Sequence, residues 1–310
     1  MKKIVSIIGI ILTIFILSSC TTPIDNDKLN VVTTIFPVYD MARSIGRDKI
    51  NLSLMVAPGQ DIHSYDPSTD DIINAKKCDV LLYVGDNMES WIPDIINSKD
   101  TDKDQMVVEL SHDERINLEA LEHHKEFEDT HLHKHNVDMH IWTNPNYAII
   151  MVENIKEALM EMDPENKDFY QENALEYTQS LKQIINEIYA IIQESKRRTL
   201  YFGSPFAFYY FTRAFNLGHE TIYDTCSIEV EPTIDDIVKM NTMLKEKEVP
   251  VLYTKELLND SIAKKVIEGT NAEICMLHSG HNVSIEDFNN GITFIQIWQN
   301  NIVALKKGLL

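Results

Sequence analysis

A long amphipathic helix near the middle of the chain constrains the fold more than any other feature of the sequence. It is predicted between residues 163 and 198, where Asp163-Pro164-Glu165 supplies an N-cap, a proline at the first helical position and an early acid. The basic run Lys196-Arg197-Arg198 suits the negative end of the helix dipole. Apolar or aromatic residues recur every three or four positions and give the helix one apolar face, at Tyr170, Ala174, Tyr177, Leu181, Ile184, Ile188 and Ile192.

Short β-branched runs alternate with amphipathic stretches on both sides of this helix. Such alternation is typical of parallel sheets with crossover helices. The predicted strands cover residues 30–36, 52–57, 80–84, 106–110, 199–202, 220–223, 249–253 and 273–277. The predicted helices cover residues 38–45, 68–77, 89–97, 146–162, 207–215, 233–247, 261–269 and 285–306. The sequence therefore favours an α/β fold with the long helix as a rigid connector; the alternative is a long helix packed within one domain.

A short internal similarity supports two related halves. Residues 65–72 read Tyr-Asp-Pro-Ser-Thr-Asp-Asp-Ile, and residues 230–237 read Val-Glu-Pro-Thr-Ile-Asp-Asp-Ile. Each segment places a proline and a hydroxyl residue before paired acids, which is the pattern of a helix start. Shared capping chemistry is the alternative explanation of this similarity.

The first residues are typical of an export signal rather than of a folded domain. Two lysines precede an apolar run from Ile4 to Leu17, followed by Ser18-Ser19-Cys20. Residues 17–20 resemble the bacterial lipoprotein box, in which the cysteine becomes the lipid-carrying N-terminus; an ordinary export signal is the alternative. Residues 20–29 are expected to be a flexible tether. No later apolar run reaches membrane length, so we expect an exported body on a lipid anchor.

The charge and the cysteines limit the partners further. A formal net charge of −20 gives the chain no long-range attraction for phosphate backbones, which argues against nucleic-acid binding. Export permits disulfides, and Cys226 and Cys275 in the second half are a candidate pair. Cys78 is expected to be a small buried residue at a helix end.

The histidines are concentrated in one segment. Five of the 11 lie in thirteen residues, interleaved with acids within the segment 109–135. They are His123, His124, His131, His133 and His135. Such a composition does not form a packed core, and neutral imidazoles suit zinc, copper and nickel. We expect a loop that captures metal ions near a tighter site; the alternative is a solvated polar loop.

Four other histidines stand where predicted strands give way to loops or helices. His63 follows a strand and a Pro-Gly turn, and His140 precedes a helix, with Asp138 placed to fix its tautomer. His278 and His281 follow the last predicted strand. Ligands of open α/β sheets bind beyond the carboxyl ends of strands, so each of these histidines is a candidate metal ligand.

Together these features resemble the metal-receptor lipoproteins of zinc and manganese ABC importers over residues 30–310. The resemblance rests on the ordered set Thr33-Thr34-Ile35-Phe36-Pro37, Pro58-Gly59, His63-Ser64-Tyr65, Asp138-x-His140-x-Trp142 and Glu231-Pro232, with the histidine loop before His140. It implies two similar α/β lobes with mainly parallel sheets, one long connecting helix and a metal site in the interlobe cleft. The implied units are the signal 1–19, the tether, lobes 30–162 and 199–310, and the connecting helix 163–198.

The resemblance also implies a ligand set, from which this chain departs. His63 and His140 match the first two ligands of the family. Pro205 stands where the family usually has a third histidine, and a proline side chain cannot bind metal. The family's last ligand is commonly a carboxylate after the final strand, a place that falls near His278. We therefore predict a set of His63, His140 and His278. The candidates for the fourth position are His281, Glu229, Glu231 and water.

The function implied is an exported, lipid-anchored receptor, expected to be a monomer on the outer face of the cytoplasmic membrane. It would bind Zn2+ and deliver it to an ABC permease and its ATPase. Mn2+ is disfavoured because the predicted site is rich in imidazole. One alternative is an exported zinc-dependent hydrolase, but the sequence lacks the His-Glu-x-x-His and Gly-x-Ser-x-Gly motifs. Another is a zinc-buffering surface adhesin with a role in cell adhesion.

Overall fold

A computed structural model describes residues 27–98, 104–118, 137–223 and 231–310. The predicted export signal, Cys20 and most of the tether lie outside these residues. So do Glu229 and the five clustered histidines, His123, His124, His131, His133 and His135. None of the described helices is long and apolar enough to cross a membrane.

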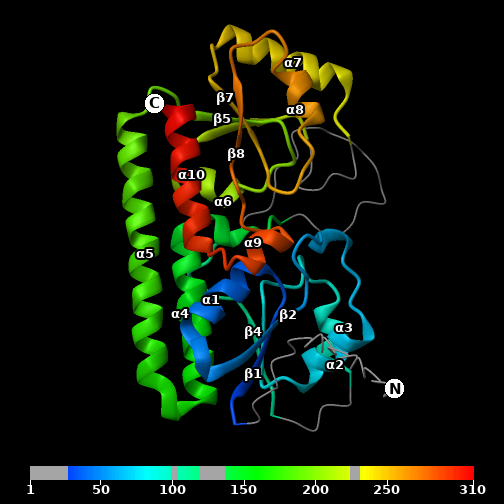
Figure 1. Cartoon of the computed structure of the whole chain (residues 1–310), viewed down its shortest axis with the longest axis vertical. Helices are drawn as coiled ribbons and strands as arrows, with labels where there is room; N and C mark the ends of the chain where they lie inside the picture. Colours follow the sequence, from blue (N-terminus) through cyan, green and yellow to red (C-terminus); the bar gives the residue numbers. More distant parts are fainter. Residues whose placement is uncertain (1–26, 99–103, 119–136, 224–230) are drawn as a thin grey trace, which may run out of the picture.

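The first half of the chain forms a sheet of four parallel strands in the order β2-β1-β3-β4 (Figure 1). Its strands are β1 (Leu29–Thr33), β2 (Ile50–Leu54), β3 (Val80–Tyr83) and β4 (Met106–Glu109). The helices that connect them are α1 (Phe36–Gly46), α2 (Thr69–Lys77) and α3 (Ile92–Ile96). Short 3-10 turns follow α1 at Arg47–Lys49 and β2 at Ile62–Ser64.

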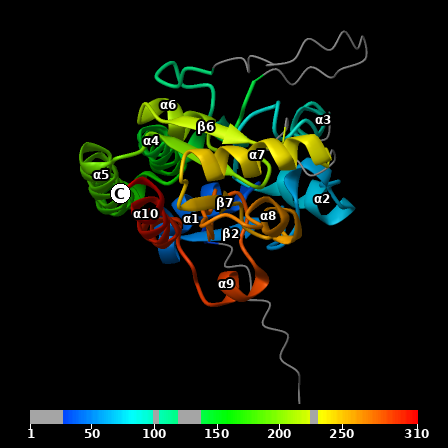
Figure 2. The same cartoon turned by 90° about the horizontal axis from the view of Figure 1, so that it is seen from above.

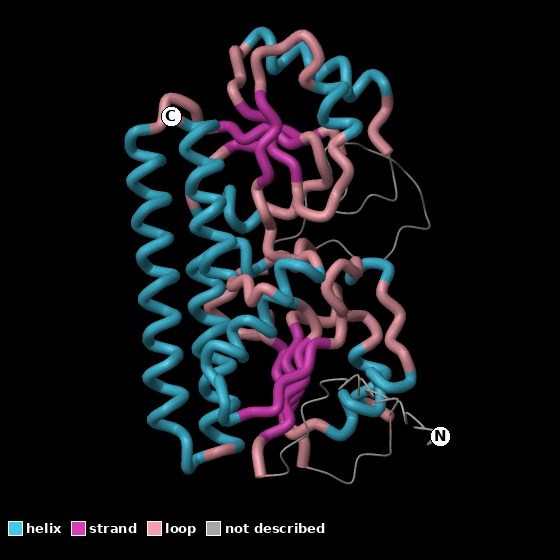
Figure 3. The backbone as a smooth tube through the Cα atoms, viewed as in Figure 1, coloured by secondary structure: helices cyan, strands magenta, loops and turns pink. Residues whose placement is uncertain are grey.

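The second half repeats this arrangement in the order β6-β5-β7-β8, again with every pair parallel. Its strands are β5 (Thr199–Phe202), β6 (Gly218–Thr221), β7 (Val251–Thr254) and β8 (Glu273–Met276). Its helices are α6 (Tyr209–Ala214), α7 (Ile234–Glu246), α8 (Ser261–Val266), α9 (Ile285–Asn289) and α10 (Phe294–Leu309). Figure 3 shows the two groups of strands one above the other. The predicted α/β class with two similar parallel-sheet lobes is confirmed.

One long helix, α5 (Lys167–Glu194), joins the lobes along one side of the molecule, and α4 (Pro145–Met162) before it packs on the first lobe. A 3-10 turn at Ile141–Thr143 leads into α4, and a second at Pro164–Asn166 leads into α5. Helix α5 runs beside both lobes (Figure 1), with α10 next to it and with α2 and α3 on the opposite side in the view from above (Figure 2). All seven residues of its predicted apolar face are buried. The rigid-connector prediction is therefore confirmed.

The two capping segments found in the sequence occupy equivalent places. Ser68 and Asp71 form a capping box at the start of α2, and Thr233 and Asp236 form one at the start of α7. Each helix leads from the outer strand of its sheet to the third strand in sheet order. The similarity therefore follows from the matching topology of the two lobes as well as from capping chemistry.

Two predicted helices have different bounds in the structure. The stretch 285–306 is broken into α9 and α10, because Gly291 takes a left-handed backbone (φ 75°) and Thr293 starts a new helix with a capping box to Gln296. Helix α3 begins at Ile92 rather than Glu89. The Glu89 carboxylate instead turns inward, where it accepts hydrogen bonds from Thr34 Oγ1, Val84 N and Gly85 N.

The cysteines have distinct environments. Cys78 is buried at the C-cap of α2, as predicted. Cys275 lies half-buried in β8 beside Glu273 and Lys307. Its predicted partner Cys226 lies outside the described residues, so the pairing stays a prediction.

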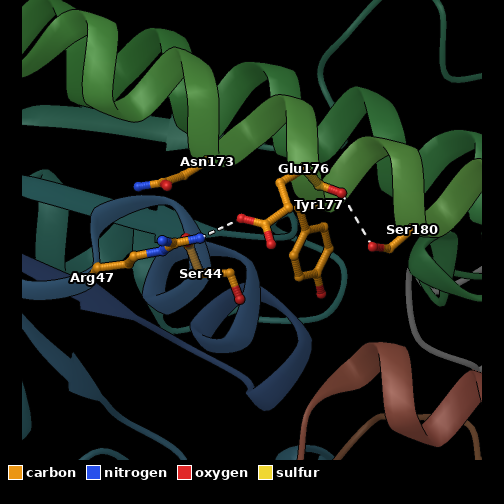
Figure 4. A pocket seen from close by; sticks show the side chains of 6 residues that line it. All are labelled: Ser44, Arg47, Asn173, Glu176, Tyr177 and Ser180. Carbon is orange, nitrogen blue, oxygen red and sulfur yellow. Dashed lines mark hydrogen bonds and ion pairs between the residues drawn. The ribbon is translucent and has the colours of Figure 1, made fainter.

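Polar contacts fix α5 against the end of α1. Arg47 Nη2 pairs with Glu176 at 2.5 Å, and Asn173 Nδ2 donates to the Ile45 carbonyl at 2.9 Å. Figure 4 shows the pocket that these side chains line together with Ser44, Tyr177 and Ser180. This pocket contains none of the candidate metal ligands. Its side chains join the first lobe to the connecting helix.

A buried carboxylate ties α1 to both α5 and α10. Asp40 in α1 accepts hydrogen bonds from Tyr177 Oη of α5 and from Phe294 N at the start of α10, each at 2.9 Å. It also pairs with Arg43 at 2.5 Å, and Arg43 Nη2 donates to the Ile292 carbonyl at 2.8 Å. Burial raises the pKa of Asp40, and the Arg43 charge opposes that rise. This single side chain therefore connects three helices from three parts of the chain.

We expect Asp40→Ala to lower the free energy of unfolding by about 2 to 3 kcal/mol, because it leaves buried donors without their acceptor. The matched control is Asp48→Ala in the exposed 3-10 turn, which should stay within about 0.5 kcal/mol of the wild type. Urea unfolding of the three chains measures both effects. Equal losses in the two variants would contradict the connecting role of Asp40.

Candidate metal centre

Loops at the carboxyl ends of both sheets bring three histidines together. His63 lies in the 3-10 turn after β2, and the Asp61 carboxylate caps that turn by accepting from His63 N at 3.0 Å. His140 precedes the 3-10 turn that leads into α4. His281 follows β8 in the second lobe. The site therefore lies where the strand ends of the two lobes face each other.

The three imidazoles form a compact group. Ligand atoms of His63, His140 and His281 all lie within 4.8 Å of one another. The ring centroids are 5.9 Å apart for His63 and His140, 5.3 Å for His63 and His281, and 5.2 Å for His140 and His281. Two nitrogens on a tetrahedral zinc are roughly 3.4 Å apart, so small side-chain movements would bring these rings onto one ion.

His140 is held in one orientation. Its Nδ1 lies 2.8 Å from Asp138 Oδ1, and the same carboxylate oxygen accepts from His140 N at 2.7 Å. A carboxylate on Nδ1 places the proton there and leaves Nε2 with a free lone pair, as in many metal-bound histidines. His140 Nε2 is buried and has no hydrogen-bond partner among the described residues. Asp138 therefore lies where it can fix the tautomer of His140, as predicted from the sequence.

His281 shares this property. Its side chain is buried, and its Nε2 is the other imidazole nitrogen without a partner among the described residues. A buried polar atom without a partner costs free energy, so two such nitrogens in one group indicate that a ligand completes them. A metal ion accepts lone pairs from both nitrogens without requiring a proton.

The structure does not bring His278 into this group, in contrast to the predicted ligand set. Gly280 takes a left-handed backbone (φ 74°), and the turn directs His278 Nδ1 to accept from Gly280 N at 3.0 Å. The same nitrogen lies 3.5 Å from the buried carboxylate of Glu256. His281, predicted only as a candidate fourth ligand, takes the place expected for His278. Sequence spacing shows both histidines in one loop but not which ring the turn directs inward.

The remaining candidates lie outside the histidine group. Glu231 is exposed before α7 and is not one of the clustered ligands. Pro205 is buried after β5, next to Ser204, whose Oγ accepts from Lys255 N at 2.9 Å. The position where the resembled family has a histidine is therefore a packed, non-coordinating part of the second lobe.

Hydrogen bonds that sequence reasoning missed join the lobes around the site. Trp142 Nε1 donates to the Ser279 carbonyl at 2.9 Å, and Tyr210 Oη donates to the Asp138 carbonyl at 2.7 Å. Trp142 is fully buried, and its ring lies 5.2 Å from that of His140 and 5.6 Å from that of His281. The Asp138-x-His140-x-Trp142 motif thus supplies a ligand, its orienting carboxylate and a link to the opposite lobe.

Glu256 fixes the loop that carries His281. Its carboxylate accepts from Ser279 Oγ at 2.5 Å and from Ser279 N at 2.7 Å. Ser279 Oγ in turn accepts from His281 N at 3.2 Å. Burial raises the pKa of Glu256, but neighbouring positive charge and the two hydrogen bonds from Ser279 together bring it below its ordinary value. The ionised carboxylate therefore organises the turn before His281.

The environment favours neutral imidazoles. Burial, followed by the charge on His140, lowers the pKa of His63 from its ordinary value to about 4. Burial also lowers the pKa of His281 well below its ordinary value, and His140, Lys255 and His63 act in the same direction. Neutral imidazole is the form that binds metal, so these two candidate ligands are in the form suited to binding at neutral pH.

Comparisons with known proteins agree with this fold. A family model for the periplasmic zinc-uptake complex component A matches residues 31–308. The high-affinity zinc uptake system protein ZnuA of Bacillus subtilis is 28% identical over 92% of this chain and 88% of its own length. The zinc-binding lipoprotein AdcA of Streptococcus pneumoniae is 25% identical over 99% of this chain, which spans 61% of AdcA. The crystal structure of the metal-dependent lipoprotein YcdH from Bacillus subtilis matches with a TM-score of 0.76, at 27% identity over 91% of this chain and 100% of that one.

The lowered pKa of His281 predicts how pH affects the metal-free chain. Below pH 6.5, its ordinary pKa, unfolding lets this imidazole take up a proton that the folded chain excludes, so acid lowers the free energy of unfolding. His281→Gln removes this contribution. We expect the difference in stability between wild type and variant to change by about 1 to 2 kcal/mol between pH 7.5 and pH 5, with the wild type losing more.

Urea unfolding with a chelator present measures this change. The control is His112→Gln, which alters an exposed histidine and should follow the wild type at both pH values. Parallel pH profiles for wild type and His281→Gln would contradict the exclusion of protons from His281.

Proposed function

Because the chain belongs to the family of periplasmic zinc-uptake complex component A proteins, we propose that it is an extracytoplasmic zinc receptor. In this proposal it binds Zn2+ between its lobes and delivers the ion to an ABC permease driven by an ATPase. The observation that carries the proposal is a pair of buried Nε2 atoms, those of His140 and His281, which have no hydrogen-bond partner in the described part of the chain and are grouped with His63. The ion is cargo: it is bound and released unchanged.

We assign the ligands as His63, His140 and His281, which replaces the predicted role of His278. Three imidazoles favour zinc over manganese, since manganese prefers carboxylate, carbonyl and water oxygens. Within the described residues the group includes no carboxylate, so the fourth position of a tetrahedral ion is open to water. Three neutral ligands leave the charge of the ion largely uncompensated, and this favours release to a transporter.

The same geometry favours a receptor over a hydrolase. A zinc hydrolase needs a general base beside the metal-bound water. The Asp138 carboxylate, which lies against the site, is already engaged by two nitrogens of His140. In this proposal the chain therefore binds and releases zinc without making or breaking a covalent bond.

Zinc titration of the purified chain tests the ligand assignment. We expect His63→Ala, His140→Ala and His281→Ala each to weaken zinc binding at least about a hundredfold, because each removes one of three coordinating nitrogens. His278→Ala is the matched control from the same loop and should stay within about threefold of the wild type. A hundredfold excess of Mn2+ should not displace the zinc.

A strong loss of zinc binding in His278→Ala, together with normal binding in His281→Ala, would restore the sequence-based assignment. Tight binding in all four variants would place the zinc site elsewhere in the chain.

Anchoring and delivery are the remaining parts of the proposal. We propose that residues 1–19 are removed on export, that Cys20 carries lipid, and that a monomer with lobes 30–162 and 199–310 works from the outer face of the membrane. The clustered histidines between His123 and His135 would collect ions for the cleft. A lipid anchor of this kind would keep the receptor close to its permease.

Cells that lack the gene are expected to grow poorly when zinc is chelated, and the wild-type gene should restore growth. Cys20→Ser should release the protein from the membrane fraction and reduce that rescue, because the receptor diffuses away from its permease. Membrane fractionation and growth with added zinc measure the two effects. Normal growth of the gene-deleted cells in zinc-poor medium would instead favour a buffering or adhesive role.

A further inference from the structure

A single amide side chain joins the loops that carry two of the histidines from opposite lobes. Asn282 follows His281 in the second lobe and is buried. Its Nδ2 donates to the Ala57 carbonyl at 3.1 Å and to the Gln60 carbonyl, and its Oδ1 accepts from Gly59 N at 3.4 Å. The turn of residues 57–60 in the first lobe therefore wraps around this amide.

This turn depends on Asn282 for its contact with the second lobe. Within the turn, Gln60 N donates to the Ala57 carbonyl and Ala57 N donates to Gln60 Oε1. The other hydrogen bonds described for residues 57–60 all go to Asn282. The Asn282 Oδ1 atom is itself fixed by Val283 N, which donates to it at 2.7 Å. The amide is thus held by its own lobe while it binds the other.

The position of His63 follows from this contact. His63 comes three residues after Gln60, whose carbonyl Asn282 binds, and it is the least enclosed of the three histidines. His140 and His281 are buried and held by Asp138 and Ser279 respectively. Movement of the segment 57–63 away from the loop that carries His281 would therefore open the site at its least enclosed histidine.

We propose that Asn282 is a positioning residue that latches the His63 turn to the His281 loop and thereby controls how fast a bound zinc ion leaves. The proposal rests on the proposed zinc-binding function. A latch of this kind acts on the closed state: its loss speeds zinc release while all three coordinating nitrogens remain in the chain. An aspartate of the same shape cannot replace it, because a carboxylate has no N–H groups for the two carbonyls.

The test measures zinc release from the zinc-loaded full chain after mixing with an excess of a coloured chelator. Asn282→Ala and the isosteric Asn282→Asp should each release zinc at least about tenfold faster than the wild type. Asn282→Asp loses the two hydrogen bonds that the amide donates to the first lobe, and Asn282→Ala also loses the one that it accepts from Gly59 N. The matched control is Asn241→Ala. Asn241 Nδ2 also donates to two carbonyls, those of Val266 and Glu268, but within the second lobe.

Release from Asn241→Ala should stay within about threefold of the wild type, even when thermal unfolding shows a similar loss of stability. Equal acceleration in Asn241→Ala, or release from both Asn282 variants within about threefold of the wild type, would overturn the latch. A wild-type chain that takes up no zinc would instead remove the proposed function itself, and the latch with it.

Amide exchange in the wild-type chain gives a second test that does not depend on folding of the variants. Gly59 N is protected by Asn282 Oδ1 in the closed site, so zinc loading should slow its exchange at least about tenfold by suppressing opening. An unchanged rate at Gly59 on zinc loading would overturn the proposal.

Discussion

The packing of α5 against helices from both lobes is the interaction on which the rest of the structure depends. Its apolar face contributes to one continuous buried cluster that contains residues of both lobes, from Val31 in β1 to Trp298 in α10. Asp40 adds a polar junction within this packing, joining α1 to Tyr177 of α5 and to Phe294 of α10. Because the lobes share a close-packed core, large rotations about a hinge would have to break it. The lobes therefore form a rigid frame.

This frame determines what the metal centre can do. The carboxyl ends of the two sheets face each other, and the loops that follow β2 and β8 bring His63 and His281 to His140. Burial lowers the pKa values of His63 and His281, which favours the neutral imidazoles that the proposed metal binding needs.

Prediction from the sequence succeeded best where a local pattern is compatible with only one local structure. The period of the α5 residues could only be satisfied by a buried helical face, and the strand runs fall within a few residues of β1 to β8. His63 and His140 could be found because each lies after a predicted strand or before a predicted helix. Asp138 could be found because a carboxylate two residues before His140 can accept a hydrogen bond from a ring nitrogen of that histidine, and the structure adds a bond from its backbone N. The break before Thr293 was missed because the apolar period continues across Gly291.

What the sequence by itself determined is the set of chemical groups: two βα halves around one amphipathic helix, and histidines placed after strands or before helices. These follow from periodicity, capping and composition, which act over a few residues. Only the tertiary structure decided which groups meet. The left-handed turn at Gly280 directs His278 toward Glu256 and leaves His281 with His63 and His140, and Asn282 reaches a turn more than two hundred residues away. Such choices depend on the packing of distant segments, for which no local pattern carries information.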